Sequence, residues 1–537
     1  MVVNMNKRNI LLCIIIITLF FIGFMFFYYS GDKYEKLIVD ENEWNEIVNK
    51  RNITESIIIS SFKINDYEAF FDNSQCTYYY SIIEGKKNAF NPKIKLKTNK
   101  KNAKIAVDKS INEKLIKDND VIHILVYTDT EFCIYNLRCT TLPILNINCA
   151  SFDDITKEDS YKMDLFLFDN RKNATSRIIT SEGKIHSRGG ISKVFPKLGY
   201  KINLTTKSLG NNTRNNDLSL LGMRKDDDWI LYAGYNDQEK IRNVFTTNLW
   251  NESCAKNNMF GINNGNEFKF VELFINNSYW GLYAIGYPID EKQMDLDSEN
   301  EYLFKKFQYD TVEEDILING NFDSGYYKLL NKTSNEKDAW DSLKDYYVKI
   351  LTSDNIEELY SISDINNVID YYLYQEFIQG NDNAVGKHLK NVFITIKKFN
   401  NKNVVLYTPW DNDLSFGNGY EEGAKNFGNP YNIEVNKTID FTMNAIGALR
   451  DKNDSNINGL IEKRYKELRK TYWSEEHIEK LISDYSKIIY DSGAFKRDEI
   501  RWPAGTYNYG NTELTEFKNY IFKRLEYLDD FINKTSK

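Results

Sequence analysis

Two aspartates separated by one residue, Asp411 and Asp413, stand in the segment PWDNDLSFG at residues 409–417. Side chains at i and i+2 on extended backbone point to the same side, and paired carboxylates suit a Mg²⁺ ion that carries a phosphate. Asp382 lies earlier in the chain and could orient a substrate hydroxyl or accept its proton, while Asn391 could add an oxygen ligand. An isolated Asp-Asn-Asp segment is more often a polar turn, so the elements around it decide between the two interpretations.

The elements around these residues follow one another in a defined order. Asp364 can cap the N-terminus of a helix, and Gly380 follows as its stop. The apolar residues of this helix recur at helical spacing: Ile365, Val368, Ile369, Tyr372, Leu373 and Phe377. Residues 391–396 and 404–407 are predicted as the two strands of a hairpin. The resulting order of helix, acidic loop, hairpin and acidic loop is that of a kinase C-lobe.

A glycine pair lies in the turn RGGISK at residues 188–193, between predicted strands at residues 184–187 and 200–204. Glycine lacks the Cβ that keeps a phosphate away from backbone N–H groups, so this turn could cradle phosphate oxygens. A plain Gly-Gly hairpin turn is the alternative. The other elements predicted for this small mixed lobe are a strand at residues 162–168, a helix at 237–250 and two strands at 270–274 and 279–285.

Helices dominate the C-terminal part of the chain, where apolar spacing near 3.6 predicts them at residues 457–472, 475–490 and 513–532. Trp410, beside the aspartate pair, is interpreted as a packing residue. Arg501 and Trp502 have two interpretations: a cation placed near the site, or a stack on the surface.

The N-terminus contains an uncharged, mostly apolar run at residues 10–29. As a helix this run is about 30 Å long, the thickness of a bilayer core, which predicts a single-pass membrane anchor. The alternative is a cleaved signal peptide, but no small-residue cleavage site follows the run. Charges on its two sides nearly balance, and the body of the protein is expected on the non-cytoplasmic side.

Residues 31–140 read as short extended segments and are predicted as a small β-rich module of unknown role. Four cysteines fall in or just after this region: Cys76, Cys133, Cys139 and Cys149. An even set of this kind is consistent with two disulfides outside the cytosol, and four buried free thiols are the equal alternative.

Composition limits the classes of function. The length of 537 residues predicts two or three domains. The formal net charge of −8 excludes the positive field on which nucleic-acid binding depends, so no nucleic-acid partner is expected. The 4 histidines form no closely spaced pair, which disfavours histidine-based zinc chemistry.

Six segments in this order resemble the CotH kinase family, the atypical protein kinases named after a spore-coat protein. They are HSRGGISKVFPKLGYKINL (186–204), DDWILYAGYNDQEKIRN (227–243), FVELFINNSYWGLYAI (270–285), YLFKK (302–306), GNDNAVGKHLKNVFI (380–394) and PWDNDLSFG (409–417). The resemblance extends from about residue 142 to residue 532. It implies a degenerate kinase-like fold that uses ATP and a divalent metal, Mg²⁺ or Mn²⁺, to phosphorylate Ser or Thr of a protein.

The resemblance also implies roles for individual residues. Asp382 corresponds to the catalytic aspartate, and the three metal ligands correspond to Asn391, Asp411 and Asp413. Arg188 and Ser192 belong to the turn that faces the phosphates. Lys197 and Lys201 are both candidates for the lysine that neutralises them, and the sequence does not choose between the two.

Two further positions of the family pattern bear on the nucleotide site. The acidic partner of the lysine is expected at Asp237 or Glu239. At the position that resembles a kinase hinge, the chain has Tyr287 and Pro288 where the family has a glutamate, and Pro288 removes one backbone N–H donor.

The predicted fold class is therefore α+β: an atypical protein-kinase-like two-lobed fold, preceded by a transmembrane helix and a small β-rich module. The expected boundaries are 1–30 for the anchor, 31–140 for the module and 141–537 for the kinase-like domain, with lobes at about 141–290 and 291–537. The predicted function is transfer of the ATP γ-phosphoryl group to Ser or Thr of a coat or surface protein. The alternatives are a catalytically silent adhesion or scaffold module, nucleotidyl transfer on the same metal site, and a carbohydrate-active enzyme.

Overall fold

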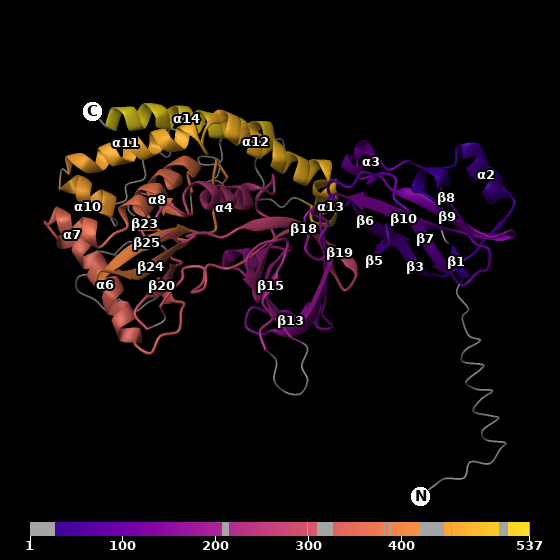
Figure 1. Cartoon of the computed structure of the whole chain (residues 1–537), viewed down its shortest axis with the longest axis horizontal. Helices are drawn as coiled ribbons and strands as arrows, with labels where there is room; N and C mark the ends of the chain where they lie inside the picture. The colour runs from indigo at the N-terminus through magenta and orange to yellow at the C-terminus, as the bar shows by residue number, and fades with distance from the viewer. Residues whose placement is uncertain are drawn as a thin grey trace, which may run out of the picture.

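The computed structural model of the chain describes residues 27–29, 31–206, 214–297, 299–308, 326–380, 382–385, 388–418, 445–452, 454–503 and 514–535. Strands dominate the first half of the chain and helices the second (Figure 1). The mixed α+β class predicted from the sequence is confirmed. Along the long axis, two N-terminal sheets, a barrel and a helix-covered sheet follow one another (Figure 1).

The segment predicted as β-rich consists of two sheets in the described part of the chain. The first contains, in spatial order, β1 (Phe27–Tyr29), β7 (Ile94–Thr98), β3 (Ile59–Ile64) and β4 (Tyr67–Glu68). The second contains β5 (Phe70–Asp72), β6 (Thr77–Ser81), β10 (Glu131–Thr140), β9 (Ile122–Tyr127) and β8 (Lys104–Val107), with β2 (Asn52–Ile53) beside β10. The helices here are η1 (Tyr34–Leu37), α2 (Glu41–Asn49) and α3 (Glu113–Lys117). We refer to residues 27–140 as the N-terminal module.

Most of the predicted membrane anchor, residues 10–26, lies outside the described residues. Its last three residues are not helical: they form β1, which pairs antiparallel with β7 and places Phe27 opposite Thr98. None of the described helices is long and apolar enough to cross a membrane.

Seven strands close a barrel in the middle of the molecule, where the sequence predicted a small mixed lobe without specifying a barrel. They are β11 (Ile144–Asn148), β12 (Tyr161–Phe168), β13 (Ile178–Arg188), β14 (Gly199–Thr205), β17 (Asp228–Tyr232), β19 (Ser278–Gly286) and β18 (Phe268–Ile275). The barrel closes because β11 pairs in parallel with β18, far away in the sequence. Alternate residues such as Tyr200, Ile202 and Leu204 fill its interior.

Shorter elements connect the barrel to the rest of the chain. These are η2 (Phe152–Asp154), η3 (Ile191–Val194), β15 (Leu218–Ser219), β16 (Lys225–Asp226) and α4 (Arg242–Ser253). The predicted helix at residues 237–250 therefore begins five residues late. Asp237 lies before the helix and accepts a hydrogen bond from the backbone N–H of Arg242, the first residue of α4 (2.6 Å).

The C-terminal part has one main sheet, β21 (Tyr327–Leu329), β20 (Tyr302–Lys306), β24 (Val392–Phe399) and β25 (Lys402–Pro409), and a small pair, β22 (Ala384–Val385) and β23 (His388–Leu389). Helices α11, α12 and α14 run along the top of this part in Figure 1. The helices are α6 (Glu336–Thr352), α7 (Ile356–Ser361), α8 (Ile365–Ile378), α10 (Ala445–Asp451), α11 (Ser455–Lys470), α12 (Glu475–Ser486), the π-helix η4 (Lys487–Asp491), α13 (Ala494–Arg501) and α14 (Leu514–Thr535).

The helix and hairpin that present the acidic residues follow the prediction. Asp364 caps α8 by accepting from the Asn367 backbone N–H (3.2 Å), and the helix ends at Gln379, whose φ of 47° is left-handed. The hairpin β24–β25 turns at Asn400 and Asn401, both with positive φ.

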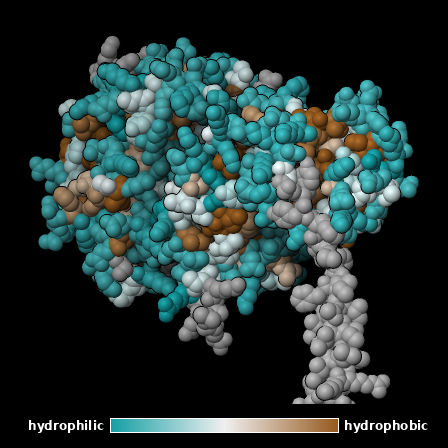
Figure 2. All heavy atoms as spheres, turned by 45° about the vertical axis from the view of Figure 1, so that its right-hand side comes forward, coloured by the Kyte–Doolittle hydropathy of each residue, from teal (hydrophilic) through white to brown (hydrophobic). Residues whose placement is uncertain are grey.

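The described cysteines are unpaired, so the structure favours free thiols over the alternative of two disulfides. Cys133 and Cys139 are buried in the N-terminal module, and burial raises the pKa of Cys133 to about 11 and that of Cys139 to about 12. The face of the molecule in Figure 2 is mostly hydrophilic, with hydrophobic residues in separate patches.

Candidate active site

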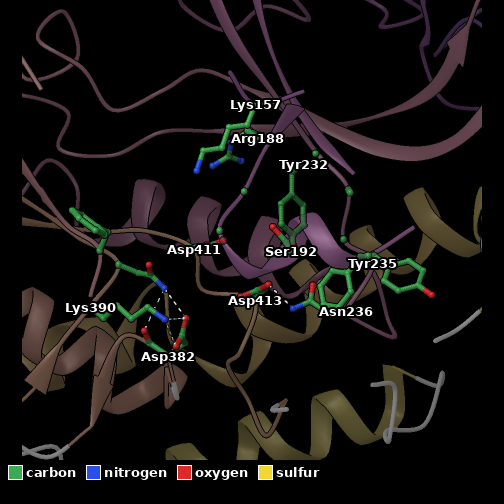
Figure 3. Close-up of a pocket in the computed structure, with 18 of the residues that line it drawn as sticks. Lys157, Arg188, Ser192, Tyr232, Tyr235, Asn236, Asp382, Lys390, Asp411 and Asp413 are labelled. Carbon is green, nitrogen blue, oxygen red and sulfur yellow. Dashed lines mark hydrogen bonds and ion pairs between the residues drawn. The ribbon is translucent and has the colours of Figure 1, made fainter. Parts of the chain in front are cut away.

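A cavity of about 670 Å³ lies between one end of the barrel and the C-terminal sheet, a volume in the range of small-molecule sites. On the barrel side it is lined by the glycine turn at residues 188–192 and by the loop at 232–236 that follows β17. On the other side it is lined by the ends of β20 and β21 and by the acidic residues (Figure 3).

The β24–β25 hairpin brings the acidic loops together at one end of the cavity. Val392 lies opposite Pro409, so Asn391 and Trp410 flank the same pair of strands, and the Trp410 N–H donates to the Asn391 carbonyl (3.0 Å). Asn391 and Asp411 both have positive φ, 53° and 56°, a left-handed conformation that Asn and Asp tolerate better than other non-glycine residues. Both residues line the cavity.

The Asp382 carboxylate contacts the side chains of Asn391 and Lys390. The Asn391 side-chain amide donates to Asp382 Oδ2 (2.9 Å), and Lys390 Nζ contacts both carboxylate oxygens (2.7 and 2.9 Å), as Figure 3 shows. The adjacent Asn383 fixes the loop by donating to the Trp410 carbonyl (2.6 Å). Burial raises the pKa of Asp382, and Lys390 partly opposes that rise.

Asp413 lies on the same side of the cavity as Asp411. It accepts a hydrogen bond from the Asn236 side chain (2.7 Å), which comes from the loop after β17. Burial and the neighbouring Asp411 raise the pKa of Asp413 well above its usual range. The intervening Asn412 is held by its backbone N–H, which donates to Asn243 of α4 (3.0 Å).

This set of oxygens fits a divalent cation. Asp411 and Asp413 supply carboxylates, and the Asn391 amide nitrogen is already used, which leaves its oxygen for a ligand. Within the described ranges, three carboxylates whose oxygens lie within 4.8 Å of one another occur elsewhere, at Asp217, Asp226 and Asp227. That triple is already in contact with Lys292, so it offers a cation less free charge.

Four cations line the cavity: Lys157 and Arg188 on the barrel side, and Lys305 and Lys328 on the side of the acidic residues. In the part of the chain that the structure describes, none of the four has a carboxylate within 4.0 Å. Burial and the nearby Arg188 lower the pKa of Lys305 to about 8, and burial lowers the pKa of Arg188. Both side chains lie over the Trp410 ring, at 5.4 Å for Lys305 and 5.7 Å for Arg188. Arg188 and Lys305 are half-buried, and half-buried cations without a carboxylate partner are typical of sites for multiply charged anions.

The glycine turn closes the barrel end of the cavity. Gly189 has a φ of 129°, and a Cβ at this position would lie 2.2 Å from Ser192 Oγ, so only glycine fits. A Cβ at Gly190 would meet nothing within 4 Å, so its backbone is open to the cavity. Ser192 lies in η3 and lines the cavity beside Arg188.

The two candidate lysines have different environments. Lys197 lines the cavity and is fully buried, where Nζ contacts Asp498 Oδ1 (2.7 Å) and the Leu282 carbonyl (2.7 Å). Burial lowers the pKa of Lys197 to about 8. Lys201 is absent from the cavity wall and pairs with Asp228 (2.8 Å), because its position on β14 points out of the barrel.

The acidic partner of Lys197 is Asp498, so the prediction of Asp237 or Glu239 was wrong. Both of those residues pair with Arg242 at the start of α4. Sequence reasoning missed Asp498 because α13 lies far along the chain and only Arg501 and Trp502, at its end, were singled out. It also missed Lys157, Lys328, Lys305 and Lys390, although Lys305 and Lys390 stand within the quoted segments YLFKK and GNDNAVGKHLKNVFI.

Two other predicted features lie away from the cavity wall. Tyr287 and Pro288 follow β19 outside it, and the Arg224 guanidinium lies 4.6 Å from the centre of the Tyr287 ring. Arg501 stacks on Trp502 and Trp280, at 4.1 and 4.6 Å, which favours the surface stack over a cation at the site. Trp410 is buried against Phe393 and so packs as expected.

Comparison with known proteins agrees with this geometry. The family model described as CotH kinase protein matches residues 185–528, most of the chain. The match includes the glycine turn, the β24–β25 hairpin, both acidic loops and α13. A search of curated proteins gave no significant match. The chain belongs to the CotH kinase family.

Proposed function

We propose that the protein transfers the γ-phosphoryl group of ATP to Ser or Thr hydroxyls of a protein substrate. The observation that carries this proposal is that one cavity holds both a pair of carboxylates and cations that lack a carboxylate partner. Asp411 and Asp413 line it together with Arg188 and Lys305, neither of which has a carboxylate within 4.0 Å among the described residues. A metal-bound polyphosphate would contact both groups at once, the metal at the carboxylates and the phosphates at the cations.

In this proposal Asp411, Asp413 and Asn391 would hold Mg²⁺ or Mn²⁺, which would neutralise charge on the phosphates. Arg188 and Lys305 would bind phosphate oxygens, and the backbone of the turn at residues 189–192 would lie against them. Lys197 would add positive charge from behind the turn, held in place by Asp498.

Asp382 would orient the acceptor hydroxyl. In the transfer, the hydroxyl oxygen forms a bond to the γ-phosphorus, the bond from that phosphorus to the bridging oxygen breaks, and ADP leaves. Asp382, whose pKa burial raises, accepts the hydroxyl proton. Lys390 holds both oxygens of Asp382 and so fixes the direction of that carboxylate.

The remaining parts of the proposal concern where the protein acts. We propose a coat or surface protein as the substrate, a membrane anchor within residues 10–26, which precede β1, and a non-cytoplasmic body. The position of β1, which begins at Phe27 at the edge of a sheet, is compatible with an anchor that ends just before it.

The test is transfer of label from γ-labelled ATP to a Ser-rich protein, with Mg²⁺ or Mn²⁺, by the wild type, Asp411→Asn and the control Asp217→Asn. We expect transfer by the wild type and Asp217→Asn and none by Asp411→Asn. Label from α-labelled ATP alone would replace the proposal with nucleotidyl transfer. Absence of both labels, together with absence of metal-dependent ATP binding, would favour a silent adhesion or scaffold module.

A further inference from the structure

Helix α13 lies between the barrel and the N-terminal module, beside β19 and α3 (Figure 1). Two consecutive residues of this helix are fully buried and contact different parts of the molecule. Arg497 contacts the N-terminal module and β18, whereas Asp498 contacts the cavity lysine Lys197. The helix thus connects a segment that precedes the family match to the wall of the candidate site.

The contacts of Arg497 form a junction of three segments. Its guanidinium donates to Asn119 Oδ1 (2.9 Å), Thr140 Oγ1 (3.2 Å) and the Ser492 carbonyl (2.8 Å). It also pairs with Glu272 of β18, which is fully buried and accepts from Thr140 Oγ1 (2.8 Å). A buried arginine with this many charge-assisted bonds has one allowed position.

The N-terminal module touches the same region at further points. Lys117 pairs with Asp491 (2.9 Å), and Lys496 pairs with Asp118 (3.3 Å). At Gly493, where φ is 71°, a Cβ would lie 2.4 Å from the Ile116 carbonyl oxygen. The backbone that precedes α13 is therefore in direct contact with the end of α3.

On the opposite side, Asp498 Oδ1 accepts from Lys197 Nζ (2.7 Å) and from the Leu282 backbone N–H (2.8 Å). Gly281, with a φ of 137°, allows this approach, because a Cβ there would lie 2.6 Å from Asp498 Oδ1. The Lys197 amine therefore depends on α13 for its only carboxylate partner within the described part of the chain.

We infer that the N-terminal module fixes the cavity lysine Lys197 through Arg497 and Asp498, which act as positioning residues. The inference rests on the proposed ATP site for its effect on activity, but the coupling itself is a property of the folded protein. While the module contacts the Arg497 guanidinium, α13 stays in place and the Asp498 carboxylate stays in contact with Lys197 Nζ. When the contacts of Arg497 with the module are lost, the position of Lys197 is no longer fixed.

The test measures the rate at which an amine-acetylating reagent modifies Lys197 in the full chain, by mass spectrometry, together with the KM for ATP. The variant Asn119→Gly removes one of the module's two acceptors for Arg497, the other being Thr140 Oγ1, and keeps a backbone that suits its φ of 59°. The matched control is Asn102→Gly, which has a similar φ of 60° and an exposed side chain in the same module.

We expect Asn119→Gly to raise the acetylation rate and the KM for ATP while kcat changes little, and Asn102→Gly to change neither. Arg497→Met should give the larger rise, about tenfold for a lost charge-assisted bond, and Arg497→Lys should restore part of the protection. In the Asp498→Asn background, Asn119→Gly should have no further effect.

The inference would be overturned if the acetylation rate of Lys197 stayed at the wild-type value in Asn119→Gly and in folded Arg497→Met. If Arg497→Met does not fold, Asn119→Gly decides. Failure of the proposed function would look different. If the wild type binds no ATP but the acetylation rate of Lys197 still depends on Asn119, the proposed phosphoryl transfer is refuted and the coupling between the N-terminal module and Lys197 stands.

Discussion

Replacement of Lys305 by methionine tests the role of the unpaired cations. The substitution keeps the length of the side chain and removes its charge. Lys305 is half-buried between Arg188 and Asp411 and has no carboxylate within 4.0 Å in the described residues. A charge-assisted contact of about 1.5–3 kcal/mol to a phosphate oxygen corresponds to about 10- to 150-fold in affinity. We therefore expect the Kd for metal-bound ATP to rise by that factor.

Stability should respond in the opposite sense. The burial that lowers the pKa of Lys305 shows that the ammonium is costly in the absence of ligand, and nearby Arg188 adds repulsion. An apolar side chain of similar volume removes both costs, so the free energy of unfolding should stay the same or rise. Weaker ATP binding together with an unchanged or higher Tm would separate a ligand-binding role from a packing role.

The pH dependence gives an independent measurement of the same residue. With a pKa of about 8, Lys305 loses its charge as the pH rises through 8, and only the charged form attracts phosphate. ATP affinity of the wild type should fall above pH 8, and Lys305→Met should lack the part of that fall due to Lys305. The assay is titration with a fluorescent ATP analogue, with Lys201→Met as the control outside the cavity. Equal affinities of Lys305→Met and Lys201→Met would refute the reasoning.

Three further outcomes follow from the contacts described. The affinity for Mn²⁺, measured by calorimetry, should fall as the pH is lowered, and the fall should begin above the pH range in which carboxylates usually titrate. The reason is that the pKa of Asp413 is raised, so protons compete with the metal at higher pH. A fall only near pH 4 would contradict this. Gly281→Ala should cost about 1–3 kcal/mol in urea unfolding, because its φ of 137° suits glycine alone; an unchanged midpoint would exclude strain there. Arg524→Met should cost about 3–5 kcal/mol in the same assay because it removes the cation of the buried Arg524–Glu376 ion pair, whereas the exposed-pair control Lys518→Met should cost under about 1 kcal/mol.

The parts of the fold and site that the sequence predicted depend on short-range patterns. The α8 cap at Asp364, the β24–β25 hairpin and the glycine turn each follow from neighbours within a few residues. Because the hairpin register then fixes which ends meet, Asn391 and Asp411 could be placed together in advance. Arg188 was assigned to a phosphate-facing turn only through the family pattern, and its place in the same cavity comes from the structure.

The features that were missed depend on contacts between distant segments. The barrel closes through the parallel pairing of β11 with β18, and Asp498 reaches Lys197 from near the end of the chain. Lys305 and Lys306 are adjacent residues of the same type. Because side chains alternate along β20, Lys305 points into the cavity, whereas Lys306 is buried against the Tyr327 ring. Spacing alone does not say which of two adjacent lysines faces a site whose other wall is unknown.

The most direct test of the central claim is anomalous diffraction from crystals grown with Mn²⁺ and a non-hydrolysable ATP analogue. We predict one strong manganese peak in contact with Asp411 and Asp413, and phosphate density against Arg188 and Lys305. A manganese peak at Asp217, Asp226 and Asp227 with an empty cavity, or nucleotide bound away from Arg188 and Lys305, would contradict the account.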